Sequence, residues 1–235
     1  MIKKKQLLEM VKVRQRLSET RNKINSIDFD AHWYRRVFHT FGTVFLFYYL
    51  LPDDVDWILF LKDWLPPFIV ILAITLEILR LKGKISSSHF FGLRLYEKNR
   101  VGSYVFFGMG ILLLLRFFPQ QIAIPCILCA CLGDPIIGEI RRYYEKKYVY
   151  ILGFLVCMLF FMITWFKADI WLLLLVSIIG GFGAIIGEIK KFWWLDDDFT
   201  IQILPAILLS IVWLIAINYS IELPGEIILP SVWPW

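Results

Sequence analysis

The chain has 235 residues, 59% of them hydrophobic, and its mean hydropathy is +0.66. This composition excludes an ordinary soluble globular domain and predicts an all-α, polytopic membrane helix bundle, because a lipid-exposed backbone must satisfy its hydrogen bonds internally. The formal net charge is +5, and no nucleic-acid partner is expected.

Residues 1–36 form a basic segment of mixed charge that precedes the first apolar run. A partial helical stripe of leucine and valine predicts either a helix at the membrane interface or a solvated helix. No secretory signal peptide is expected, because some 36 polar residues come before the first apolar segment.

Residues 37–235 are interpreted as one transmembrane domain. A membrane-spanning helix needs about 20 apolar residues, and seven apolar segments follow in chain order: 37–51, 64–80, 101–117, 121–138, 148–166, 170–188 and 200–218. The first of these is short for a span unless it draws on the following "DWILFL".

The basic residues alternate with these segments. Of the 25 Lys and Arg residues, 22 lie in 1–36, 80–100, 139–147 and 189–199, and only Lys62, Arg116 and Lys167 lie elsewhere. Basic loops remain in the cytoplasm, so the pattern predicts seven spans with a cytoplasmic N-terminus.

The four cysteines all lie inside apolar runs, and "CILCAC" lacks a nearby His or fourth Cys that would complete a zinc site. They are interpreted as packing residues without a disulfide. Gly180, Gly181 and Gly183 in the sixth apolar segment are explained best as contact points between helices.

Most of the unusual polar residues fall on the predicted cytoplasmic side. Basic groups stand there in "RRVFHTFG", and carboxylates occur together with basic groups in "GLRLYEKNRVGS", "CLGDPIIGEIRRYYEKK" and "GEIKKFWWLDDDFT". Carboxylate oxygens suit Mg²⁺ bound to a nucleoside triphosphate, while Lys and Arg neutralise phosphate charge. The pattern therefore favours a nucleotide site beside the membrane.

Each of these groups has a simpler explanation. Asp134 and Pro135 together are typical of a helix N-cap, and the Asp196–Asp198 triplet of a solvated turn that caps the last helix. The segment 94–100 fits a set of positive anchors, and His39 is either a packed polar residue or a base.

The ordered set of motifs resembles the CTP-dependent lipid kinases, the family of dolichol kinase, the CTP-using diacylglycerol kinase and phytol kinase. The resemblance covers about residues 33–210, and it is carried by "RRVFHTFG", "RLYEKNRVGSYVFFGMGILLLL", "LGDPIIGEI" and "GEIKKFWWLDDDFTIQILPA". It implies transfer of the γ-phosphate of CTP, with Mg²⁺, to the hydroxyl of a long-chain lipid alcohol, either a polyprenol or diacylglycerol.

The resemblance also implies roles for particular residues. Asp134 and Asp197 would be catalytic, and the metal would be held by Asp134, Glu188, Asp196 and Asp197. Nucleotide contacts would come from Arg94, Glu97, Arg100, Gly102, Gly133, Lys146 and Lys147.

The sequence departs from the family pattern at three places. Arg142 stands where the family has a second Gly, Val149 lies where a Thr or Ser follows the Lys pair, and Asp198 replaces an Asn. A side chain in place of Gly alters how closely a phosphate approaches the backbone, so the departures bear on nucleotide choice and on activity itself.

Two other functions remain open at this point. A lipid-phosphate cytidylyltransferase also uses CTP at a membrane, but releases pyrophosphate. A transporter or a non-catalytic membrane relative would need no nucleotide. A site on the cytoplasmic face of a prokaryotic plasma membrane is the expected location.

Overall fold

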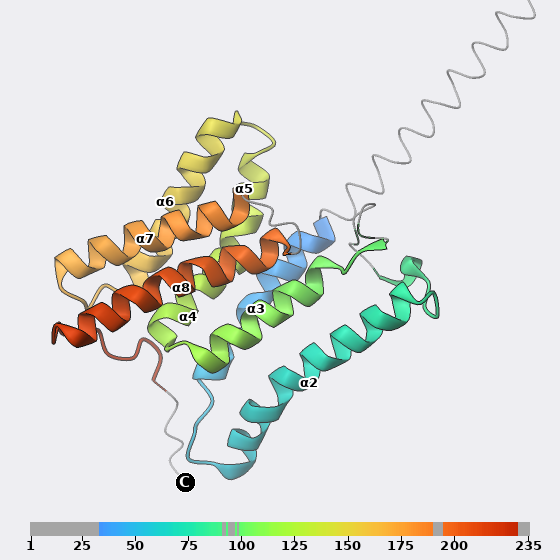
Figure 1. Ribbon diagram of the computed structural model, residues 1–235, viewed down its shortest axis with the longest axis horizontal. Coiled ribbons are helices and arrows are strands. Elements are labelled where there is room, and N and C mark those ends of the chain that lie inside the picture. Colours follow the sequence, from blue (N-terminus) through green and yellow to red (C-terminus); the bar gives the residue numbers. More distant parts are fainter. Residues whose placement is uncertain (1–32, 91–92, 94–96, 98, 190–194, 230–235) are drawn as a thin grey trace, which may run out of the picture.

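The computed structural model describes residues 33–90, 93, 97, 99–189 and 195–229. This part of the chain is helical and contains no strand. Helical residues 33–41 lead into η1 (Gly42–Tyr49), α2 (Asp56–Leu81), η2 (Ser87–His89), α3 (Ser103–Phe117), α4 (Gln120–Leu128), η4 (Cys129–Gly133), α5 (Asp134–Ile140), α6 (Lys146–Thr164), α7 (Ile170–Ile189) and α8 (Asp197–Asn218) (Figure 1).

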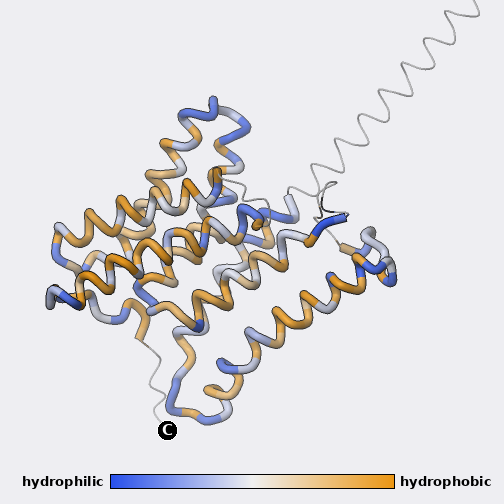
Figure 2. The backbone as a smooth tube through the Cα atoms, viewed as in Figure 1, coloured by the Kyte–Doolittle hydropathy of each residue, from blue (hydrophilic) through white to orange (hydrophobic). Residues whose placement is uncertain are grey.

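Five of the helical segments are long and apolar enough to cross a membrane, as a multi-pass membrane protein requires. They are Asp56–Leu81, Gln120–Ile140, Lys146–Thr164, Ile170–Ile189 and Asp197–Asn218. Along these segments the hydrophobic residues form long stretches with hydrophilic residues gathered at the ends (Figure 2).

The two remaining apolar segments are shorter than a typical span. Segment 101–117 forms the 15-residue helix α3, and segment 37–51 forms the end of helix 33–41 followed by the 3₁₀ helix η1. "DWILFL" belongs to the start of α2. The count of seven spans and the cytoplasmic N-terminus therefore stay predictions, as does the helix in 1–32, outside the described residues.

The helices pack around the pair α7 and α8, with α6 against α7 and α3 against α8. The segment Gln120–Ile140 is the most enclosed span, with 67% of its apolar window buried, whereas only 17% is buried in α2. Helix α2 packs on α3 at the edge of the bundle (Figure 1), so most of its apolar surface is left to face lipid.

Small residues bring the central helices close together. A Cβ on Gly180 or Gly181 would lie within 3.1 Å of the Phe161 or Phe154 ring, and a Cβ on Gly183 would lie 2.8 Å from the Pro205 Cα. The interpretation of these glycines as helix contacts is therefore confirmed. All four cysteines are buried and free, in agreement with a packing role.

One glycine contact fixes where α7 ends relative to where α8 begins. A Cβ on Gly187 would lie 2.5 Å from the Thr200 carbonyl oxygen, and the Thr200 hydroxyl donates a 2.6 Å hydrogen bond to the Gly187 carbonyl. Because Glu188 follows this contact and Asp197 and Asp198 precede it, the same contact sets the spacing of these carboxylates.

Candidate functional site

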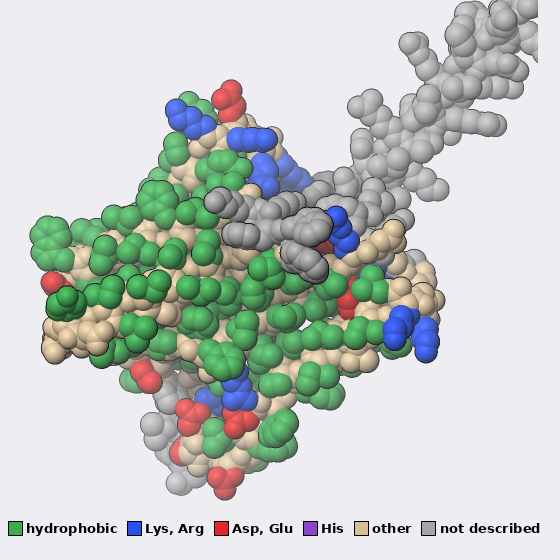
Figure 3. Space-filling view, viewed as in Figure 1, with side chains coloured by type: hydrophobic (Ala, Val, Ile, Leu, Met, Phe, Trp, Pro, Cys, Tyr) green, Lys and Arg blue, Asp and Glu red, His purple; other side chains and the backbone are tan. Residues whose placement is uncertain are grey.

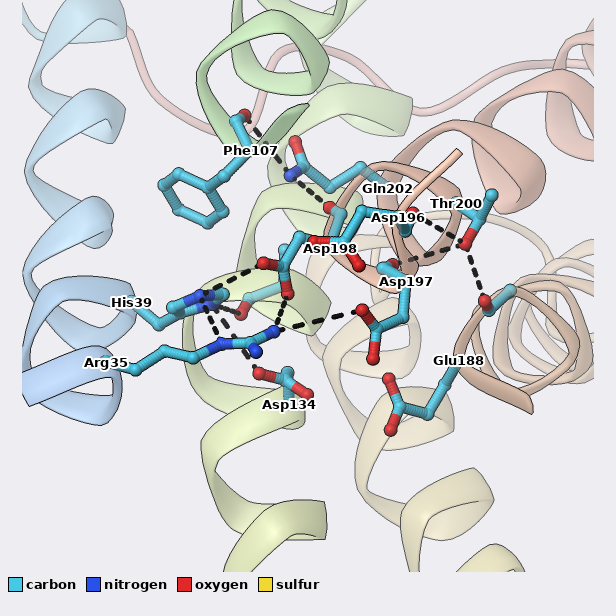
Figure 4. A network of polar contacts seen from close by, with 12 residues as sticks. Arg35, His39, Phe107, Asp134, Glu188, Asp196, Asp197, Asp198, Thr200 and Gln202 are labelled. Atoms are coloured by element: carbon cyan, nitrogen blue, oxygen red, sulfur yellow. Dashed lines mark hydrogen bonds and ion pairs between the residues drawn. The ribbon is translucent and has the colours of Figure 1, made fainter. Parts of the chain in front are cut away.

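The ends of several helices meet at one side of the molecule and bring five carboxylates together. We call these residues the acidic cluster: Asp134, Glu188, Asp196, Asp197 and Asp198 (Figure 4). They come from the start of α5, the end of α7 and the start of α8. The structure thus brings together all four residues expected to hold a metal, and adds Asp198 to them.

The start of α8 buries its carboxylates. The side chains of Asp197 and Asp198 are 8% and 1% exposed, and Asp196 makes no side-chain capping hydrogen bond. The interpretation of this triplet as a solvated capping turn is wrong. Gln202 secures the turn, because its side-chain nitrogen donates to the Asp198 carbonyl at 2.7 Å.

Asp134 is placed by a π-helical turn rather than by a helix N-terminus. The helix of α4 continues through η4 into α5, and the Asp134 N–H donates to the Cys129 carbonyl, five residues earlier. Gly133, which directly precedes Asp134, has helical dihedral angles, so no helix starts here and the N-cap interpretation is wrong. Single π turns inside α-helices occur frequently at functional sites.

The π turn also supplies a partner for His39. In a π turn the Ala130 carbonyl would pair with the amide five residues on, but that residue is Pro135, which has no N–H. His39 Nδ1 lies 3.3 Å from this carbonyl oxygen. The packed ring of His39, 2% exposed, is thereby held beside Asp134, whose Oδ2 lies 3.6 Å from Nδ1.

Arg35 and His39 are four residues apart on one helix and therefore project from the same face. Arg35 Nη2 lies 2.5 Å from Asp198 Oδ1 and 3.9 Å from Asp197 Oδ1, and His39 Nε2 lies 3.6 Å from Asp198 Oδ2. The negative charges around Arg35, led by Asp198, outweigh the effect of burial and raise its pKa.

Among the described residues, the negative charges of the cluster exceed the positive charges beside it. Arg35 pairs with Asp197 and Asp198, Arg141 pairs with Glu188, and His39 lies beside Asp134 and Asp198. Burial, a hydrogen bond with Asp197 and the charge of Asp198 raise the pKa of Asp196 to about 9. Buried charges are costly unless paired or bound to metal, so the cluster suits a divalent cation.

The loop before α3 adds a sixth carboxylate. Glu97 is 2% exposed and close enough to Arg35, Asp197 and Asp198 for their charges to act on it. Burial raises the pKa of Glu97 to about 7, the charge of Asp198 adds to this rise, and the charge of Arg35 opposes it.

Glu77 and Arg80 hold this loop in place. The Glu77 carboxylate accepts hydrogen bonds from the Gly102 N–H at 2.6 Å and the Tyr104 hydroxyl at 2.7 Å, and Arg80 donates to the Glu97 carbonyl at 3.1 Å. This pair is not among the site residues predicted from the sequence, although an acid and a base three residues apart within an apolar helix are a signal of a functional or structural polar site.

Replacing Glu97 with Gln should change how stability depends on pH. The Glu97 carboxyl binds its proton more tightly in the folded protein than in the unfolded chain. Protonation of Glu97 therefore stabilises the fold fully below the ordinary pKa of 4.5, and this stabilisation is lost as pH rises through about 7. In chelator, Glu97→Gln is expected to be more stable than wild type at pH 8, by roughly 2 kcal/mol, and similar at pH 5.

Thermal unfolding in detergent, followed by tryptophan fluorescence, measures this difference. Glu226→Gln, which changes an exposed carboxyl, should leave the pH profile as it is. Identical profiles for Glu97→Gln and wild type would contradict the assignment of Glu97 as a buried acid.

The predicted phosphate-binding residues lie outside the acidic cluster. Lys146 and Lys147 are exposed at the start of α6, and Arg100 is exposed in the loop before α3. Lys and Arg side chains gather at the end of the molecule where α5 and α6 meet, at the margin of the apolar surface (Figure 3). Arg94 lies outside the described residues, and Gly133 lies within the π turn.

Comparison of the chain with protein-family models, curated proteins and solved structures finds no match. What can be said of function therefore depends on the chemistry of this site.

Proposed function

We propose that the protein is a membrane phosphotransferase that moves the γ-phosphate of CTP to the hydroxyl of a long-chain lipid alcohol. One observation carries the proposal: five carboxylates gather where apolar helices end, and Glu188 and Asp198 among them each keep a buried oxygen that has no hydrogen-bond partner among the described residues. A site at this level suits a substrate whose hydroxyl lies among lipid headgroups and whose body lies in the bilayer.

The residues fit a divalent cation. Glu188 Oε2 and Asp198 Oδ2 are buried oxygens without a hydrogen-bond partner among the described residues, and two groups of three side chains have their ligand atoms within 4.8 Å of one another. Asp134, Glu188, Asp196, Asp197 and Asp198 would hold Mg²⁺, which neutralises phosphate charge when bound.

Positive groups of the chain would contact the phosphates. Arg35 Nη1 is buried without a hydrogen-bond partner in the described part of the chain and is free to donate to a phosphate oxygen. Lys146, Lys147 and Arg100 are exposed and would neutralise charge on the outer side of the nucleotide. Phosphoryl transfer depends mostly on such positioning and charge neutralisation.

Asp134 and Asp197 are the carboxylates proposed to act on the lipid. Four side chains of the acidic cluster form ion pairs, and Asp134 is the most accessible of them. Its side chain is 18% exposed, against 8% or less for Asp197, Asp198 and Glu188. A carboxylate that remains reachable can accept a hydrogen bond from the lipid hydroxyl and later its proton. Asp197 would orient the phosphate through Arg35, with which it pairs.

Transfer of labelled phosphate tests the proposal. Purified protein in detergent with Mg²⁺ is offered γ-labelled CTP or ATP, together with a polyprenol or diacylglycerol, and the lipid fraction is extracted and counted. We expect γ-label in one lipid with CTP. Label from α-labelled CTP instead would indicate cytidylyl transfer, and label in no lipid with folded protein would overturn the proposal.

A further inference from the structure

His39 is the one nitrogen ligand that the described residues place at the acidic cluster. Its ring is buried, with the Phe107 ring 4.7 Å away between centroids. Its two nitrogens face Asp134 Oδ2 and Asp198 Oδ2, each at 3.6 Å. These three side chains form one of the two groups able to hold a metal ion.

The π turn determines which nitrogen is available. Because Pro135 leaves the Ala130 carbonyl without an amide partner, that oxygen favours the tautomer in which His39 carries its proton on Nδ1. The lone pair then lies on Nε2, which faces Asp198. Histidines that bind metals commonly donate their other N–H to a backbone carbonyl in this way.

The bond that the described residues make to Nε2 is a weak one. Arg35 Nε donates to Nε2 at 3.4 Å, which is long for a hydrogen bond between nitrogens, so a cation at Nε2 would replace this bond. Arg35 is anchored more closely by Nη2 on Asp198. The guanidinium lies among the carboxylates, with Asp134, Asp197 and Asp198 around it (Figure 4), and marks the region where positive charge is stabilised.

A second observation points to a ligand in addition to the acidic residues. Asp198 Oδ2 belongs to a side chain only 1% exposed and has no hydrogen-bond partner in the described structure. It faces the same space as His39 Nε2. A buried carboxylate oxygen beside an imidazole lone pair leaves two strong electron donors that a cation would satisfy together.

We infer that His39, Asp134 and Asp198, whose ligand atoms lie within 4.8 Å of one another, form a mixed nitrogen–oxygen site that binds Mn²⁺ in preference to Mg²⁺. The inference rests on the cation site of the proposed function and specifies its metal. Imidazole suits transition metals, whereas Mg²⁺ prefers an all-oxygen shell that retains several waters. The Asp196–Asp198 group contains only oxygen and shares Asp198, so a second cation there would be bridged by that residue.

Pulsed electron paramagnetic resonance of Mn²⁺ tests the inference without reference to catalysis. Wild-type protein in detergent, loaded with one equivalent of Mn²⁺, should show modulation from a directly bound imidazole nitrogen. Competition by Mg²⁺ in the same sample should show that Mn²⁺ is favoured by at least about tenfold, the scale of change when a site's ligand environment is altered.

Two variants separate the roles of the nitrogens. His39→Asn keeps a donor near Nδ1 for the Ala130 carbonyl but offers nothing at Nε2, so Mn²⁺ binding should weaken by about tenfold or more. His39→Gln offers an oxygen near Nε2 and should bind Mn²⁺ without nitrogen modulation and with its preference over Mg²⁺ lost. His89→Gln, an exposed imidazole in η2, should behave like wild type.

The outcomes distinguish the metal assignment from the proposed reaction. Mn²⁺ that binds to wild-type protein without imidazole modulation overturns the role of His39, even if the same sample transfers phosphate. Imidazole modulation that disappears in His39→Gln but persists in His89→Gln supports it, even if no lipid is phosphorylated. No Mn²⁺ binding to folded protein overturns the site itself.

Discussion

Replacing Asp134 with Asn is expected to lower phosphate transfer to lipid by at least about a hundredfold, the loss usually seen when a preorganised electrostatic group is removed. Asn keeps the shape of the side chain but removes the charge that faces His39 and the open side of the cluster. Initial rates with γ-labelled CTP at saturating lipid, in the same detergent, measure the effect.

Glu139 on the same short helix provides a matched control. Its carboxylate is 41% exposed and pairs with Arg36, so Glu139→Gln should change the rate by less than about threefold, because exposed ion pairs contribute little. A near-normal rate in Asp134→Asn would overturn the catalytic assignment. Equal losses in both variants would show that the charge of α5, and not Asp134, is what matters.

Replacing Gly187 with Ala is expected to have the largest effect on the fold around the site. The added Cβ would lie 2.5 to 2.8 Å from backbone atoms of Thr200 and Ile201, which cannot rotate away, so α7 and α8 must separate locally. Overpacking of this kind typically costs about 1–3 kcal/mol. Because Glu188 and Asp197 lie on either side of the contact, Mn²⁺ binding should weaken together with the thermal unfolding midpoint.

Gly138→Ala is the control for this experiment, since a Cβ at Gly138 meets nothing within 4 Å. It should leave both the unfolding midpoint and cation binding unchanged, or raise stability slightly because Ala favours a helix. If Gly187→Ala unfolds and binds Mn²⁺ like wild type, the close approach of α7 to α8 does not position the carboxylates.

The sequence predicted the long helices well because hydropathy alone determines them. The helices α6, α7 and α8 begin and end within three residues of the segments expected from apolar composition. Hydropathy was less informative for segment 37–51, whose apolar run is short for a span and which forms the end of helix 33–41 followed by η1. Hydropathy alone also could not decide whether "DWILFL" belongs to segment 37–51 or to segment 64–80.

The members of the acidic cluster could be predicted because each lies where an apolar run meets a polar loop. Asp134, Glu188, Asp196 and Asp197 share this position in the sequence, and alternation of helices puts such ends on one side. The geometry could not be predicted, since it depends on contacts between distant segments. Arg35 lies 163 residues from Asp198, its partner.

The π turn is a further feature that the sequence pattern does not predict, because the pattern indicates the start of a helix at this point. Gly133, Asp134 and Pro135 are the residues of a typical helix start, and the same residues allow a helix to widen and continue. The difference arises from packing, because the Ala130 carbonyl released by Pro135 is satisfied by His39 from another segment. Local preference alone cannot reveal such a partner.

The length of α2 has a consequence for how the protein sits in its bilayer. With 26 residues, α2 is about 39 Å long against a hydrocarbon thickness of about 30 Å, whereas the 15 residues of α3 reach only about 22 Å. A helix longer than the hydrocarbon layer can adapt by tilting. Because Glu77 near the end of α2 binds Gly102 and Tyr104, a tilt of α2 would move the loop that carries Glu97.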